Sequence, residues 1–172
     1  MPGYVIHLAV AEEYLKKHKE NKEHYDEFIE GVIFPDSVID KSETHYGNGS
    51  SNSNVYEFLK DKKIDNSFNR GYFLHLLTDY LFYNRYIEYF SKDLYNDYDL
   101  TNEILMKKYK VVLPEKIKKS VFFKEGEDYK IITPKIAEEL IDYTSELDID
   151  EIADEILKNN KKWTTFRPLI KI

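Results

Sequence analysis

The sequence predicts an all-α fold, and three observations lead to this prediction. Apolar residues make up 42% of the 172-residue chain, which is enough to build a hydrophobic core. Apolar positions recur at spacings of three and four in most segments, as expected for amphipathic helices. One segment, residues 67–91, is apolar on nearly all sides and is predicted to form a central, buried helix. Length and the absence of a linker favour one domain over residues 1–172.

The first half of the chain, residues 1–91, is expected to carry the functional side chains. A helix is predicted over 3–18 and a second over 22–31, where Gly31 suits a helix end. A long ordered loop containing Pro35 should follow and finish in a flexible tip at 47–54. A short helix is then predicted over 53–61. The central helix comes next, with Asn66 or Ser67 as its N-cap.

The second half, residues 92–172, is expected to pack against the first half and cover it. A helix from Thr101 to about 109 is predicted, then a small hairpin over 119–132 with Gly126 near its turn. Thr133 and Pro134 form a good helix start, because proline is favoured at the first helical position, and this helix should run to 147. Asp148 precedes a last predicted helix over 149–160.

Charge and cysteine content exclude several classes of function. The net charge of −7 disfavours a protein that grips duplex nucleic acid, because phosphate contacts need a basic face. Cysteine is absent, so any transition metal must be held by His, Asp and Glu. The apolar stretch 4–11 is too short to span a bilayer and lacks the flanks of a signal peptide. We therefore expect a cytoplasmic protein without a transmembrane segment.

Five residues of metal-ligand type stand out, and each also has a structural explanation. His75 and Asp79 share one helix face at i and i+4, where they could ligate one metal or simply pair with each other. Asp36 follows a proline and could be an ordinary turn residue. His45 could be an exposed loop residue, and His7 a hydrogen-bonded core residue. The other two histidines, at 18 and 24, lie among charged residues and are expected at the surface.

Taken together, the five residues predict a metal site. Their order is a histidine on a first helix, a Pro-Asp pair, a Thr-His pair, and HxxxD on an apolar helix. In this order the first 90 or so residues resemble the zinc-dependent phospholipase C family and the related single-strand-specific zinc nucleases. The resemblance implies that Asp36, His45, His75 and Asp79 hold a first metal. It also implies that His7 and Asp79 contribute to a second.

The resemblance implies a metal-dependent hydrolase that acts on a phosphoester, either a small molecule or a lipid headgroup. One or two ions are expected, of zinc or of another divalent metal such as manganese or iron. Asp36 is the candidate for orienting or deprotonating the attacking water. No histidine follows His75, which departs from the family's pattern, so the family's third metal cluster is expected to be missing here or rebuilt from carboxylates.

Alternative functions stay open at this point. An HD-type phosphohydrolase also builds its site from His and Asp on helices, but its adjacent His-Asp pair is absent here. A non-catalytic helical protein with a structural metal is a second alternative, since structural zinc sites are closed and catalytic ones keep an open position. A nuclease that engages only a few nucleotides is compatible with the charge.

Several residues near the predicted site are candidates for substrate contacts. Arg70 and Arg85 flank the HxxxD segment and could clamp a phosphate, although surface ion pairs would explain them equally well. Lys41 and the tip at 47–54 could form a mobile lid over the site, or merely a flexible loop.

Overall fold

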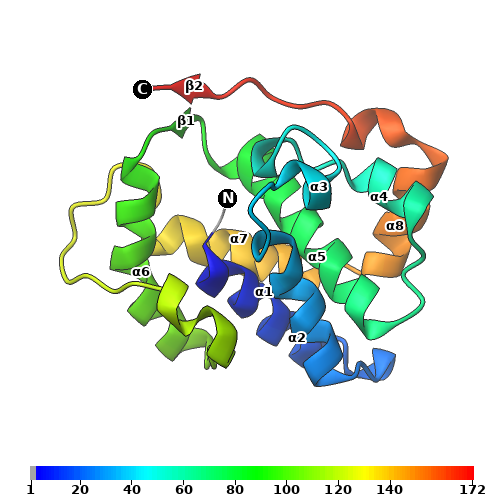
Figure 1. Ribbon diagram of the computed structural model, residues 1–172, viewed down its shortest axis with the longest axis horizontal. Helices are drawn as coiled ribbons and strands as arrows, with labels where there is room; N and C mark the ends of the chain where they lie inside the picture. Colours follow the sequence, from blue (N-terminus) through cyan, green and yellow to red (C-terminus); the bar gives the residue numbers. More distant parts are fainter. Residues whose placement is uncertain (1–2) are drawn as a thin grey trace.

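Helices make up most of the structure, a computed structural model that describes residues 3–172 (Figure 1). In chain order they are α1 (Tyr4–Lys17), α2 (Tyr25–Ile33), α3 (Ser42–His45), α4 (Val55–Asp61), α5 (Ser67–Leu81), α6 (Asp93–Tyr109), α7 (Pro134–Glu146) and α8 (Ile149–Lys158). Short 3₁₀ turns cover Lys19–Asn21, Phe34–Asp36, Ser50–Asn52, Glu115–Ser120 and Asn160–Trp163. Two strands of two residues, β1 (Tyr89–Phe90) and β2 (Ile170–Lys171), pair in parallel. The prediction of a helical fold is confirmed.

The helix ends follow the local chemistry of the sequence. The side chains of Asn54 and Asn66 accept hydrogen bonds from backbone N–H groups in the first turns of α4 and α5. Thr133 caps α7 in the same way, and Pro134 is the first residue of that helix. Asp148 accepts two backbone N–H groups at the start of α8. The caps at Asn66, Thr133 and Asp148 were predicted from the sequence, whereas the cap at Asn54 was not.

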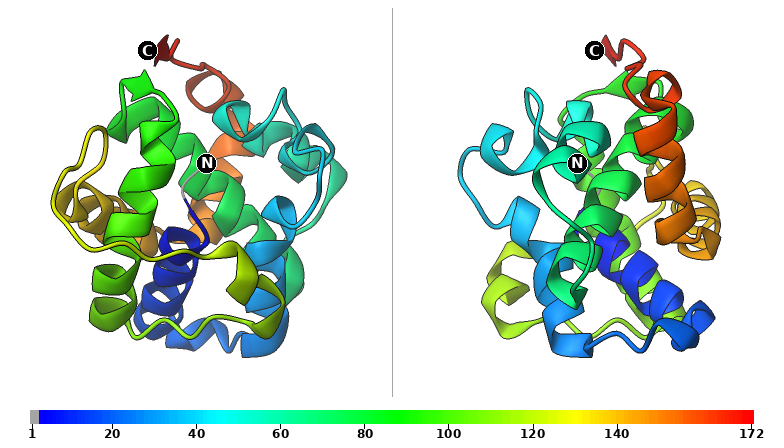
Figure 2. Two further views of the ribbon diagram at one scale, coloured as in Figure 1. Left: turned by 60° about the vertical axis from the view of Figure 1, so that its left-hand side comes forward. Right: turned by 90° about the vertical axis from the view of Figure 1, so that its right-hand side faces the viewer.

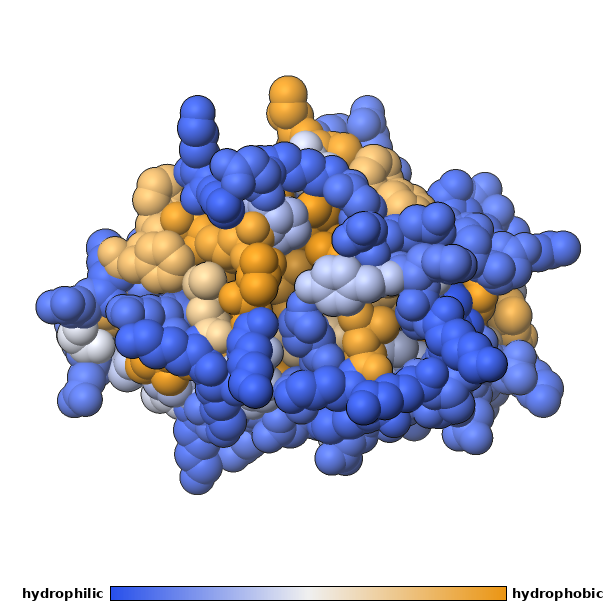
Figure 3. Space-filling model, turned by 90° about the horizontal axis from the view of Figure 1, so that it is seen from below, coloured by the Kyte–Doolittle hydropathy of each residue, from blue (hydrophilic) through white to orange (hydrophobic). Residues whose placement is uncertain are grey.

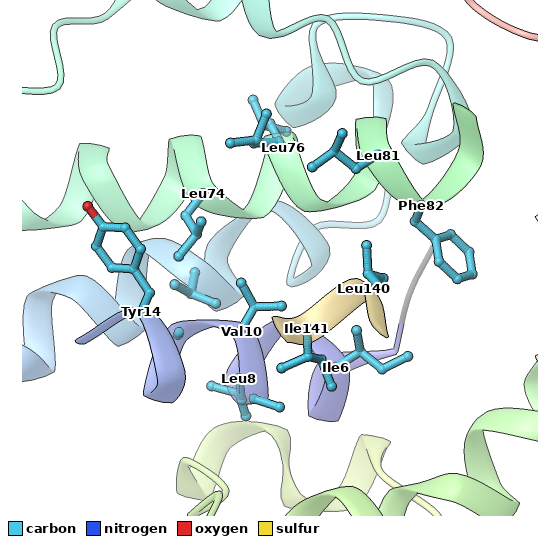
Figure 4. Packing of buried hydrophobic residues seen from close by; sticks show 14 of the residues in the cluster. Ile6, Leu8, Val10, Tyr14, Leu74, Leu76, Leu81, Phe82, Leu140 and Ile141 are labelled. Carbon is cyan, nitrogen blue, oxygen red and sulfur yellow. The ribbon is translucent and has the colours of Figure 1, made fainter. Parts of the chain in front are cut away.

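One core joins both halves of the chain, with α5 at its centre. Almost every side chain of α5 is buried, as expected for a helix that is apolar on all sides. Helices α1 and α2 pack against α5, and α7 packs against α1. Figure 4 shows Ile6 and Val10 of α1 beside Leu140 and Ile141 of α7. The second half therefore helps to hold the first helix in place.

Helices α2 and α5 approach each other closely at two glycines. A Cβ atom on Gly31 would lie 2.0 Å from the carbonyl oxygen of Phe68, and one on Gly71 would lie 2.1 Å from that of Phe28. Side chains at either position would push the two backbones apart. Gly31 was expected to end its helix. Instead α2 continues to Ile33, and Gly31 allows the close contact with α5 from inside the helix.

The hairpin predicted over 119–132 is absent, and a carboxylate explains why. Residues 121–132 form no strand. The backbone N–H groups of Lys130, Ile131 and Ile132 donate to the buried carboxylate of Asp97 on α6. The Asp97 side chain thus accepts the hydrogen bonds that a partner strand would have accepted, and the segment lies against α6 instead.

The central helix also ends earlier than the predicted residue 91. After Leu81 the chain forms a π-helical turn, Phe82–Tyr86, and then enters β1. The Asn84 side chain donates to the carbonyl of Tyr80 and accepts from the backbone N–H of Arg167 in the C-terminal segment. This segment crosses the end of α5 and pairs with β1 (Figure 1), which is a long-range contact that helical periodicity cannot reveal.

The predicted loop after α2 contains short helical turns and lies against α5. It includes the 3₁₀ turns at Phe34–Asp36 and Ser50–Asn52 and helix α3, and both 3₁₀ turns contact α5 (Figure 2). The expected flexible tip is folded back: the backbone N–H of Asn54 donates to the carbonyl of His45, and Ser53 is buried. The helix predicted from Thr101 begins at Asp93.

The surface combines polar and apolar areas. Figure 3 shows one face on which apolar side chains gather within a border of polar ones. Among residues 3–172, none of the helices has the length and apolarity that a bilayer-spanning helix needs.

Candidate metal centre

The five predicted ligands meet in the interior of the fold. His7 comes from the first turn of α1, and His75 and Asp79 from adjacent turns of α5. Asp36 ends the 3₁₀ turn after α2, and His45 is the last residue of α3. All five are at most 6% exposed. Two carboxylates and three imidazoles therefore share one buried volume without an intervening apolar side chain, which calls for a compensating cation.

Four of these residues, Asp36, His45, His75 and Asp79, form a first set whose ligand atoms lie close together. His45 Nε2 lies 3.0 Å from Asp79 Oδ2 and 3.6 Å from Asp36 Oδ1. His75 Nε2 lies 3.3 Å from Asp79 Oδ2 and 3.7 Å from Asp36 Oδ1. The two Nε2 atoms are 3.3 Å apart. Metal–ligand bonds of about 2.0–2.1 Å in a tetrahedron give ligand–ligand separations of about 3.3–3.4 Å. The five separations between these donor atoms range from 3.0 to 3.7 Å and so lie on both sides of that value.

The imidazole protons are directed away from these ligand atoms. His75 Nδ1 is 2.6 Å from the carbonyl oxygen of Val32, and His45 Nδ1 is 2.9 Å from that of Lys41. A carbonyl oxygen only accepts, so Nδ1 is the donor in both rings. In the neutral rings both Nε2 atoms then present lone pairs to each other, which is unfavourable unless one ring is protonated or a cation lies between them. This arrangement is the one in which protein histidines bind metals.

A second set of donor atoms faces the other side of the two carboxylates. His7 Nε2 lies 3.1 Å from Asp79 Oδ1 and 3.9 Å from Asp36 Oδ2. Within residues 3–172, neither of those oxygens nor either nitrogen of His7 has a hydrogen-bond partner, although all are buried. The ring of His7 stacks on that of His75, with centroids 3.7 Å apart. Three ligand atoms leave positions open for water or substrate.

The electrostatics of the cluster show how strongly these groups interact. Burial lowers the pKa of His75, but the carboxylates of Asp79 and Asp36 outweigh burial and raise it above its usual value. Burial and the neighbouring His75 lower the pKa of His7. For Asp79, burial is outweighed by His75 and His7, so its pKa lies well below the usual range. Asp79 is therefore a carboxylate ready to bind a cation.

Two further residues adjoin the cluster that sequence reasoning did not select as ligands. Lys41 Nζ lies 3.6 Å from Asp36 Oδ1 and donates to the backbone carbonyl of the same residue. Tyr98 of α6 is buried, and burial together with the carboxylate of Asp79 holds its pKa well above the usual value. Its ring packs against Gly3, where a Cβ atom would be 3.3 Å away. The sequence did not indicate Tyr98, because it belongs to residues 92–172, which were expected only to pack against the first half of the chain.

The predicted arginine contacts to substrate have other partners in the fold. Arg70 donates to the carboxylates of Glu23 and Asp150, which favours the ion-pair alternative. Arg85 donates to the hydroxyl of Tyr143 and lies over the ring of Trp163. Neither guanidinium forms an ion pair with the cluster carboxylates within residues 3–172.

The remaining two histidines differ from each other. His24 is exposed, as predicted. His18 is not a plain surface residue: its ring stacks on Tyr14, and its Nε2 lies 3.0 Å from the carbonyl oxygen of Ser145. This contact joins the end of α1 to the end of α7. It was not predicted, because the lysine-rich sequence around His18 is typical of an exposed surface.

Searches with this chain match no family model, no curated protein and no solved structure. The candidate centre therefore rests on its own residues: two groups of three within reach of one ion each, His7 with His75 and Asp79, and Asp36 with His45 and His75.

Proposed function

We propose that this protein is a metal-dependent hydrolase that cleaves a phosphoester, in the manner of the zinc-dependent phospholipase C family that its first 90 residues resemble. The observation that supports the proposal is the pair of donor sets around Asp36 and Asp79. One set has four ligand atoms, of which those of Asp36, His45 and His75 lie within reach of one ion, and the other has three and keeps open positions.

The ligand set suits zinc in particular. Imidazole nitrogens bind zinc well, and carboxylate oxygens complete its sphere when thiolates are absent. Manganese and iron accept the same donors but favour higher coordination numbers, which the first set does not supply. A pair of such cations clamps both oxygens of an in-line displacement and lowers the pKa of water.

The chain supplies the remaining chemistry. Both carboxylate oxygens of Asp36 are buried without hydrogen-bond partners. With a single cation bound at Oδ1, Oδ2 is free to orient a water molecule and accept its proton. Lys41, beside Asp36, places a positive charge where a phosphate oxygen would approach. The Nδ1 hydrogen bonds of His45 and His75 keep their lone pairs directed at the centre.

A structural metal site is the second candidate function, and burial favours it. The side chains of Asp36, His45, His75 and Asp79 are fully covered, as in closed structural zinc sites. The two candidates differ at His7, which belongs only to the three-atom set.

The first experiment measures metal content and hydrolysis together. Purified wild type is expected to carry one or two divalent ions per chain and to hydrolyse 4-nitrophenyl phosphate or bis(4-nitrophenyl) phosphate. His75→Ala and His45→Ala should lose the metal and the activity, whereas the exposed control His24→Ala should keep both. Folded wild type that binds no added zinc, manganese or iron would exclude both candidate functions.

A second variant separates catalysis from structure. His7→Phe keeps an aromatic ring to stack on His75 but removes the ligand nitrogens. A hydrolase should then retain a metal in the four-atom set and lose at least about 100-fold in kcat, since the open position is gone. Wild type that binds metal but hydrolyses neither ester would favour the structural site.

A further inference from the structure

A cleft of about 590 Å³ lies next to the metal centre, and it is lined by two segments from opposite ends of the chain. One is the turn 48–52 with Lys41, and the other is the C-terminal segment 166–171. The volume is in the range of small-molecule sites. This cleft could not be predicted from the sequence, because the C-terminal segment was expected only to cover the core.

The cleft adjoins the cluster at its inner end. Lys41 lines it and reaches Asp36, with Nζ 3.6 Å from Oδ1. Tyr83 also lines it and lies in the π-helical turn that follows α5, four residues after Asp79. The neighbouring Ser53 donates to Asp79 Oδ2 at 3.3 Å. None of the five cluster residues lines the cleft, so a ligand in it can place one group beside Lys41, which contacts Asp36.

The charge of the cleft is opposite to that of the whole protein. Lys41, Arg167 and Lys171 line it, and no Asp or Glu does, although the chain carries −7 overall. Such a local excess of positive charge attracts anions against the field of the rest of the molecule.

Arg167 is the residue best placed to recognise an anion away from the metal. Its Nη2 donates to the backbone carbonyl of Tyr83 at 3.4 Å, a long bond to a neutral acceptor. Its Nε is buried and has no acceptor among residues 3–172. Its backbone N–H is fixed by Asn84 at 2.7 Å, so the residue is anchored beside the cleft. A guanidinium with unused donors is suited to two hydrogen bonds with a carboxylate or phosphate.

Aromatic side chains lie among the charged ones. Phe90, Tyr95 and Phe166 line the cleft, and Tyr95 is 54% exposed although it is a large side chain. These rings can cover a flat apolar part of a ligand between its two ends.

We propose that Arg167, assisted by Lys171, binds a second anionic group of the substrate, so that the enzyme selects phosphoesters with two anionic groups joined by a flat apolar part. This inference rests on the proposed hydrolase function for the group at the metal end. Anion binding at Arg167 depends on the cleft and not on hydrolysis, so it can be tested in a binding experiment without turnover.

The test compares two probes that differ by one anionic group, phenyl phosphate and 4-carboxyphenyl phosphate. In zinc-free protein, calorimetry should show that wild type binds the carboxylated probe at least about tenfold more tightly. Zinc-loaded protein should show the same preference in kcat/KM. Arg167→Gln should abolish the preference, and Lys171→Gln should reduce it. Lys161→Gln, an exposed control on the same segment, should leave it unchanged.

The outcomes separate this inference from the proposed function. Equal binding of the two probes to wild type, no binding of the carboxylated probe in either form, or a preference that survives in both Arg167→Gln and Lys171→Gln would overturn it. A preference that depends on Arg167 in a protein without hydrolytic activity would support the anion site and count against the hydrolase.

Discussion

Replacing Gly71 by alanine should destabilise the protein and weaken its metal site at the same time. In most helices a Gly→Ala change stabilises by about 0.5–1 kcal/mol, because glycine loses more backbone entropy on folding. Here the new Cβ would lie 2.1 Å from the carbonyl oxygen of Phe28, and side-chain rotation cannot relieve a clash between backbones. The opposite sign is therefore expected.

The distances set the size of the effect. Contacts of Cβ atoms below 3.0 Å are essentially never found, so α2 and α5 must separate by about 0.9 Å or more. Overpacking of this kind costs about 1–3 kcal/mol, and the rigid clash places this site in the upper part of that range. Each kcal/mol lowers Tm by about 2–4 °C in a chain of this size. A fall of roughly 4–12 °C is expected.

The metal site should respond because His75 lies one turn after Gly71 and bonds to α2. Its Nδ1 is 2.6 Å from the carbonyl oxygen of Val32, and the separation of the helices would stretch this to about 3.5 Å, the limit of a hydrogen bond. Losing a bond that orients a histidine ligand weakens metal binding by about 10–100-fold.

Thermal unfolding followed by circular dichroism, and zinc titration against a competing chelator, measure the two effects. Gly31→Ala removes the other member of the contact and should lower Tm by a similar amount. A Gly71→Ala protein with an unchanged or higher Tm would refute the close-contact explanation. A lower Tm with unchanged zinc affinity would refute the link from the helix contact to His75.

Three further predictions follow from other parts of the structure. Zinc at about 100 times its Kd should stabilise wild type by about 2.7 kcal/mol, and a calorimetric Tm that does not move with zinc would contradict a site formed only in the folded state. Asp97→Ala should cost about 2–4 kcal/mol in urea unfolding, because three backbone N–H groups lose their acceptor, and Asp97→Asn, which keeps one oxygen, should cost less. Burial and a hydrogen bond to Asp142 raise the pKa of Tyr109 above its usual value of 10.0, so the contribution of Tyr109 to stability should be constant below pH 10 and fall above it, where the unfolded phenol ionises. Tyr109→Phe should make that fall shallower, and an identical slope in both proteins would argue against this contribution.

The sequence by itself determined the helical class, most helix starts and the five candidate ligands. Caps are local, so Asn66, Thr133 and Asp148 could be read from a few neighbouring residues. The ligands were also readable, because a His and an Asp on one face of an otherwise apolar helix need a partner.

Only the tertiary structure decided what these residues do together. The packing of α1 and α5 decides how far apart the donor atoms lie and how they divide into a four-atom and a three-atom set. The packing of α6 decides that Tyr98 lies beside them. The missing hairpin and the cleft under the C-terminal segment likewise depend on contacts between distant residues, such as Asp97 with Ile132 and Asn84 with Arg167. Periodicity predicts which face of a helix or strand is buried, but it does not predict which element covers that face. The candidate metal site and the cleft are formed by such contacts between elements, so only the tertiary structure could reveal them.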